Sequence, residues 1–295
     1  MQQEVRTIDR ESCLKIINSM TLMDNVFMSV FFENRIDCVE AVLNAVLPFK
    51  VSVKSVHTQV DYNNPYGRDV RFDIDAMGTD EKEYNIEVQR CSSGAVPKRA
   101  RFHSGLLDSR ALGKGQDFDE IVDTYVIFIT EHDVLKGNKP LYHIERKILE
   151  TGKEFNDGSH ILYINTAYKG KGESDLENLI HDFRCVNPED IRNESLRKRF
   201  TEIKNNPTVK EVDTMNEMLK NYIDLEVDKM RDEILEEGRE EGRAEGRAEG
   251  REEGRASNSR AIAKSLLVVG VLSVEQIAEC CQLTVEEVNE LKASA

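Results

Sequence analysis

The stretch RFDIDAMGTDEKEYNIEVQR, residues 71–90, decides the fold, because it predicts two β-strands joined by a tight turn. Apolar and polar residues alternate with a period of two on both sides of residues 78–80, where Gly, Thr and Asp favour a turn. The strands are expected over roughly residues 68–77 and 83–91. A hairpin centred near Asp80 places Asp73 opposite Glu87.

Side chains of the first of these strands are expected to separate by face. Successive side chains of a strand point to opposite sides of the sheet. Phe72, Ile74 and Ala76 should therefore share one face, and Asp73 and Asp75 should share the other.

Asp73 and Glu87 form the candidate site. Directly opposed residues have Cβ atoms roughly 4.5–5.5 Å apart, and like charges there are destabilising unless something offsets their repulsion. Two carboxylates, a backbone carbonyl and waters suit Mg²⁺, a hard ion that prefers oxygen ligands. Gln89, on the same side as Glu87, could position a metal-bound water. Acidic residues are also typical of the solvated face of a half-buried sheet, so the acids alone leave both interpretations open.

The segments around the hairpin predict elements in the order α, β, β, β, α, β. Residues 21–48 have apolar residues at helical spacing, and residues 51–62 alternate as a strand does. Pro97 begins a basic helix, and TYVIFIT, residues 124–130, is typical of a strand buried on both faces. This order indicates a layered α/β or α+β domain in which helices cover a mixed sheet.

Two further strands are expected over residues 141–148 and 160–168, and a helical pattern begins at Asp175. The sequence NNP suggests that the main domain, residues 1–205, ends there. A connecting helix over residues 206–235 is expected to follow.

Residues 236–255, EEGREEGRAEGRAEGREEGR, repeat a four-residue unit. On a helix, each four-residue step advances a column by about 40°, so Gly, Arg and Glu would form three slowly drifting stripes. Each glycine would cost about 1 kcal/mol relative to Ala. The segment is either a solvated linker or a helix that pairs its Glu stripe with the Arg stripe of a second copy.

The tail, residues 256–295, predicts short helices with Ser273 and Thr284 as N-caps. Two such helices could form a helix-turn-helix. The tail has few basic residues, however, which favours a small packing or oligomerisation module. The repeat and the tail together offer a route to a homo-oligomer.

The 295-residue chain has a formal net charge of -15, which counts against a nucleic-acid partner because phosphate contacts rely on Lys and Arg. The local distribution of charge differs from this total. Residues 85–115 contain six basic residues, including Arg90, Arg99 and Arg101, and only two acidic ones. An acidic chain can therefore present one basic face.

A cytoplasmic protein that does not enter a membrane is expected, since no apolar run is long enough to span one and no signal peptide is recognisable. Six cysteines are scattered without a CxxC pair. Their spacing predicts reduced thiols and supports neither a zinc site nor a disulfide framework.

Taken together, these features resemble the PD-(D/E)XK nuclease superfamily, and more closely its recombination-promoting nuclease and transposase group. The similar segments are DNVFMSVFF with LNAVL, RDVRFDIDAMGTD, YNIEVQR, KRARFHSGLLDSRALGKGQDF and TYVIFIT, and the spacing from Asp73 to EVQ is the most specific feature. The resemblance covers most of the chain from about residue 20, including the charged repeat and helical tail. It implies a restriction-endonuclease-like αβββαβ core with a helical C-terminal extension.

Carried over to this chain, the resemblance makes Asp73 and Glu87 ligands of Mg²⁺ and places Gln89 where many superfamily members have Lys. Glutamine cannot act as a general base or supply positive charge, so its role would be to orient the attacking water. Family members often have a Lys after the early Phe, where this chain has Met28. Having Met in place of Lys removes a phosphate contact but no metal ligand.

The function implied by the resemblance is Mg²⁺-dependent endonucleolytic hydrolysis of DNA, associated with recombination or mobile elements. Arg90, Arg99 and Arg101 would contact phosphates, although each also fits an ordinary solvated face. Glu33 or Glu40 could add a carboxylate to the site, and the sequence favours neither. The alternative is a catalytically inactive DNA-binding or assembly protein that retains the nuclease fold.

Overall fold

The computed structural model describes residues 10–63, 67–112, 115–221, 223, 257–268 and 271–293. The chain divides into two compact units, residues 1–222 and 223–295, each with its own apolar core. The charged repeat, residues 236–255, lies outside the described residues.

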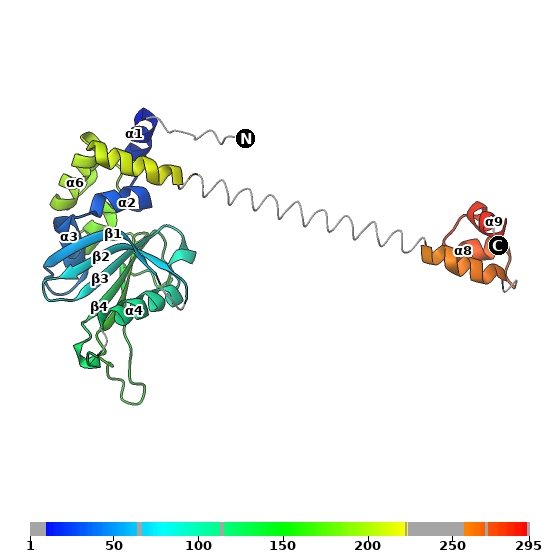
Figure 1. Cartoon of the computed structure of the whole chain (residues 1–295), viewed down its shortest axis with the longest axis horizontal. Coiled ribbons are helices and arrows are strands. Elements are labelled where there is room, and N and C mark those ends of the chain that lie inside the picture. Colours follow the sequence, from blue (N-terminus) through cyan, green and yellow to red (C-terminus); the bar gives the residue numbers. More distant parts are fainter. Residues whose placement is uncertain are drawn as a thin grey trace. The chain divides into compact units, whose positions relative to one another are not determined.

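A six-stranded mixed sheet forms the centre of the first unit (Figure 1). The strands lie in the order β1-β2-β3-β4-β6-β5, in which β3, β4 and β6 run parallel and the remaining pairs are antiparallel. Their bounds are β1 Val53–Tyr62, β2 Val70–Gly78, β3 Glu83–Gln89, β4 Thr124–Thr130, β5 Leu141–Ile144 and β6 Ser159–Asn165. The expected mixed α/β class is confirmed.

Helices cover both faces of this sheet (Figure 1). On one face, α2 and α3 pack directly on the strands, and α5 and α6 pack against α3, whereas α4 covers β4 and β6 on the other face. The helices are α1 Arg10–Ser19, α2 Asn25–Phe32, α3 Ile36–Val46, α4 Pro97–Ala111, α5 Asp175–Asp182 and α6 Glu194–Asn205; the short 3-10 turns are η1 Ser92–Ala95, η2 Phe118–Glu120 and η3 Pro188–Asp190.

The first unit extends past the end expected near residue 205. Residues 209–221 are helical, and Val212, Met215 and Leu219 are buried in the same core as α2 and α3. This burial removes apolar surface from water, which ties the segment to the sheet domain.

Residues 21–48 form two helices because the chain turns between α2 and α3. Asn34 has φ 57°, a left-handed conformation that Asn tolerates better than most residues. Seven of the eight residues of α2 are buried, including Phe27 and Phe31, whose rings lie 5.0 and 5.8 Å from that of Phe200 in α6. α2 is thus an internal helix with no solvated stripe.

The β2–β3 hairpin has the register expected from a turn near Asp80. Ile74 faces Ile86, and Asp75 faces Asn85. Paired residues end at Ile74 and Ile86, so the two strands part beyond this point.

The expected division of side chains by face is wrong at Phe72. Ile74 belongs to the core on the α2 and α3 side, whereas Phe72 lies under α4, with its ring 5.0 Å from that of His103. The alternation breaks at Asp73, just beyond the last residue of β2 that pairs with β3, although Ile74 and Phe72 both remain paired with β1.

The second unit consists of helical residues 257–268, α8 (Val274–Cys281) and α9 (Val285–Ala293) around a small apolar core. Both expected N-caps are confirmed: the Ser273 hydroxyl accepts from Gln276 N, and the Thr284 hydroxyl accepts from Glu287 N. No helix in the described parts of the chain combines the length and apolar content of a membrane span.

Candidate active site

The candidate site lies where β2 and β3 separate. Hydrogen bonds to side-chain carboxylates there replace the backbone hydrogen bonds of paired strands. Val88 N donates to Asp73 Oδ2 at 3.0 Å, and Asp73 N donates to Glu87 Oε1 at 3.2 Å. Each carboxylate is thus bound to the backbone of the opposite strand. The structure brings Asp73 and Glu87 together as the sequence predicts.

Both carboxylates are withdrawn from solvent. Asp73 is 8% exposed and Glu87 is fully buried. Burial first, and then the charge of Glu87, raise the pKa of Asp73 to about 7. The repulsion anticipated from the sequence is therefore present, and it disfavours the ionised form of Asp73.

Glu87 is surrounded by donors from β3 and α4. Asn85 Nδ2 donates to Glu87 Oε1 at 2.9 Å, and His103 Nδ1 lies 3.5 Å from the same oxygen. Arg99 Nη2 donates to Oε2 at 3.2 Å, while its Nη1 is held by the carbonyl of Gly94 at 3.0 Å. Arg99 thus places one positive charge directly at the site.

Two glutamines hold Asp73. Gln89 Nε2 donates to Oδ2 at 3.3 Å, and Gln59 Nε2 donates to Oδ1 at 3.4 Å. Gln59 lies in β1 with φ 53°, and it also donates to Asn25 Oδ1 at 3.0 Å. Sequence reasoning missed Gln59, because nothing in the alternation of β1 shows that the backbone turns there.

The three predicted phosphate-binding arginines have different environments. Arg90 pairs with Asp24 and Glu131, and Arg99 pairs with Glu87. The Arg101 side chain is exposed on α4. Two of the three are therefore held by acidic groups of this chain, and Arg101 faces solvent.

The glutamates considered as additional ligands contact β1. Glu33 Oε2 accepts from Thr58 N at 2.8 Å and from its hydroxyl at 2.6 Å, and Glu40 Oε1 accepts from Val53 N at 2.8 Å. Each carboxylate satisfies a backbone donor of this strand.

A family model described as "PD-(D/E)XK nuclease family transposase" matches residues 21–232. The chain belongs to this family. Comparisons with curated proteins and with solved structures returned no significant match. The resemblance seen in the sequence is confirmed, and membership of the PD-(D/E)XK nuclease family associates the chain with DNA hydrolysis and mobile elements.

The donor set fits the divalent metals that PD-(D/E)XK nucleases generally use. Asp73 and Glu87 offer oxygen ligands from adjacent strands, and hard cations such as Mg²⁺ and Mn²⁺ prefer such ligands. A cation near both would offset the repulsion that raises the pKa of Asp73. The hydrogen bonds from Val88 N and Asn85 would keep the ligands oriented, as outer-shell partners do.

Proposed function

We propose that the chain is a Mg²⁺-dependent endonuclease that hydrolyses DNA phosphodiester bonds in recombination or mobile-element functions, acting in the cytoplasm. The observation that carries the proposal is the buried carboxylate pair. Asp73 and Glu87 come from adjacent strands, and each is bound to the backbone of the other strand. Such an arrangement pre-organises two ligands before an ion binds.

The chain's own residues have separate roles in this proposal. Asp73 and Glu87 hold the ion, and Gln59 and Gln89 fix the orientation of Asp73. When bound, Mg²⁺ supplies a water of lowered pKa and offsets charge on the phosphoryl oxygens. Gln89 would orient that water by hydrogen bonding, because an amide cannot accept its proton.

DNA is the proposed partner, bound through the basic side of α4. Arg101 is exposed on this helix. Arg99 counters the charge of Glu87, which reduces repulsion between the site and a phosphate. Phosphate contacts of this kind position DNA without reading its sequence.

One observation favours a second candidate function, a catalytically inactive DNA-binding or assembly protein. The guanidinium of Arg99 pairs with Glu87 at 3.2 Å and so compensates the charge of a candidate ligand without any metal ion. Gln89 also lacks the positive charge that Lys would provide at this position.

Nicking of supercoiled plasmid in the presence of Mg²⁺ tests the proposal. Wild-type protein and an Asp61→Ala control should nick, since Asp61 is an exposed aspartate paired with Arg71. Asp73→Ala should lose at least about 100-fold in rate, the scale expected when charge stabilisation is removed from a transition state.

Equal nicking by wild type and Asp73→Ala would remove Asp73 from the site. No nicking by any of the three proteins, combined with retained DNA binding, would establish the inactive alternative. Calorimetric titration of wild type and Glu87→Ala with Mg²⁺ then reports ion binding separately from cleavage.

A further inference from the structure

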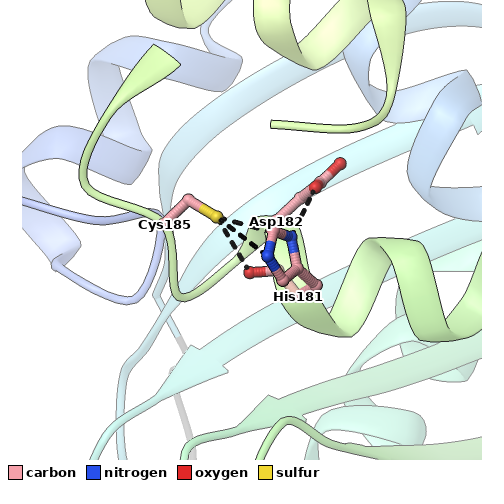
Figure 2. Close-up of side chains that lie close together, drawn as sticks. All are labelled: His181, Asp182 and Cys185. Carbon is pink, nitrogen blue, oxygen red and sulfur yellow. Dashed lines mark hydrogen bonds and ion pairs between the residues drawn. The ribbon is translucent and has the colours of Figure 1, made fainter. Parts of the chain in front are cut away.

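A second group of ligand-type side chains lies at the C-terminal end of α5 (Figure 2). His181, Asp182 and Cys185 present an imidazole nitrogen, a carboxylate oxygen and a sulfur that all lie within 4.8 Å of one another. Within the described ranges, this is the one group of three or more His, Cys, Asp and Glu residues with such spacing. None of the three belongs to the carboxylate site.

Two distances within the group are close to those between ligands of one metal ion. Asp182 Oδ1 lies 3.3 Å and Cys185 Sγ lies 3.4 Å from His181 Nδ1. In a tetrahedral zinc site, with Zn–S about 2.3 Å and Zn–N or Zn–O about 2.0–2.1 Å, neighbouring ligand atoms are roughly 3.4–3.6 Å apart. Cys185 Sγ also lies 3.8 Å from His181 Nε2, so the imidazole has to rotate about its side-chain torsions before one of its nitrogens points at an ion shared with both neighbours.

The Asp182 carboxylate is already oriented. It is fully buried, its Oδ1 accepts from Arg192 N at 2.8 Å, and its Oδ2 accepts from Asn193 N at 2.8 Å. A carboxylate has about four lone-pair positions, so these bonds leave capacity for an ion. Ligating carboxylates in metal sites are commonly held by such outer donors.

Cys185 is a buried thiol before any ion binds. Its Sγ donates to the carbonyl of His181 at 3.4 Å. Binding of a metal ion would form the sulfur–metal bond and release the thiol proton to solvent.

The group is accessible through His181. The His181 side chain is 38% exposed and lines a cavity of about 470 Å³, together with four basic residues, Lys169, Lys171, Arg184 and Arg192, and two acidic ones, Glu131 and Glu177. A divalent ion bound by one thiolate and one carboxylate carries no net charge. Water or an anion drawn in by the basic lining can therefore complete the coordination.

We propose that His181, Asp182 and Cys185 form a binding site for a thiophilic divalent ion, best fitted by Zn²⁺, with a fourth position open to the cavity. The mixed N, O and S ligands distinguish it from the oxygen ligands of Asp73 and Glu87. The proposal does not depend on DNA cleavage. A search for paired cysteines misses this site, because its ligands are of three types.

Cobalt spectroscopy on the tag-free full chain tests the site. Titration of the metal-stripped protein with Co²⁺ should give a thiolate-to-cobalt charge-transfer band that saturates at one equivalent, and Zn²⁺ should abolish it. A Cys91→Ser control, which removes an exposed cysteine, should behave as wild type. Cys185→Ser should lose the band and should bind Co²⁺ at least about 100-fold more weakly. Loss of an outer-shell partner alone reduces metal affinity by up to about 100-fold, and Cys185 is a proposed ligand.

Absence of the band in wild type overturns the proposal, and so does its persistence in Cys185→Ser. If Cys185→Ser does not fold, His181→Gln decides the question, because this side chain is partly exposed. In His181→Gln, a weakened and shifted charge-transfer band supports the site, and an unchanged band refutes it. An unchanged band in Asp73→Asn shows that the ion is not bound at the carboxylate pair.

Discussion

Replacing Asp73 with Asn should stabilise the metal-free protein at neutral pH, although it removes a candidate ligand. Burial and the charge of Glu87 raise the pKa of Asp73 from its ordinary value of 3.8 to about 7. Between these two values the folded protein retains a proton that the unfolded chain has released. Asp73 therefore lowers stability progressively as the pH rises from 3.8 to about 7.

The size of the effect follows from linkage. One pKa unit corresponds to about 1.4 kcal/mol, so a pKa raised from 3.8 to about 7 costs about 4 kcal/mol once Asp73 is ionised. At pH 5 less than half of this cost is present. Asn has nearly the same shape, can accept from Val88 N, and does not ionise. Its NH2 group cannot accept from Gln59 as Asp73 Oδ1 does, and this loss does not vary with pH. The stability gained by Asp73→Asn should therefore increase by about 3 kcal/mol between pH 5 and pH 8.

Urea denaturation with a chelator present measures this difference at each pH. Burial also raises the pKa of Asp75 to about 6 and that of Glu83 to about 7, so the pH profile of wild type alone is not diagnostic. The difference between variant and wild type reports Asp73 together with its interaction with Glu87. An Asp61→Asn control should show no such increase, since Asp61 is exposed. A difference that stays constant from pH 5 to pH 8 would refute the reasoning.

Three further outcomes are expected. Gly94→Ala should displace the amide of Gln89, because the added Cβ would overlap Oε1, and it should reduce nicking about 10-fold or more. Gly105 has open space around it, so Gly105→Ala should stabilise α4 by about 0.5–1 kcal/mol. Equal nicking by both would contradict the positioning role of Gln89. Lys204→Met should cost about 2–4 kcal/mol in urea denaturation, because three backbone carbonyls lose their donor, and a loss below about 1 kcal/mol would contradict this. Deletion of residues 236–255 should reduce the mass in solution measured by light scattering if the repeat pairs two copies, and an unchanged mass would exclude that role.

Local patterns in the sequence were enough to predict the hairpin and the order of the elements. The alternation around Asp80 reflects the period of two of an extended strand, and the turn limits the register. The approach of Asp73 to Glu87 follows from that register. These features depend on residues that are close in sequence, so they are readable without the rest of the fold.

The surroundings of the carboxylates were decided by tertiary contacts. Arg99 reaches Glu87 only because α4 crosses the sheet there, and Gln59 reaches Asp73 only because β1 turns beside β2. Neither contact produces a periodic pattern in the sequence.

One departure from the sequence-based expectations has a tertiary cause. Phe72 changes face just beyond the last residue of β2 that pairs with β3, and it packs under α4. Arg90, a predicted phosphate contact, is exposed and also pairs with Asp24 and Glu131. Patterns of residue type describe what a segment can form with its own neighbours. The partners of a charged side chain, and the point at which two strands separate, are settled by the free energy of the assembled core and its long-range ion pairs.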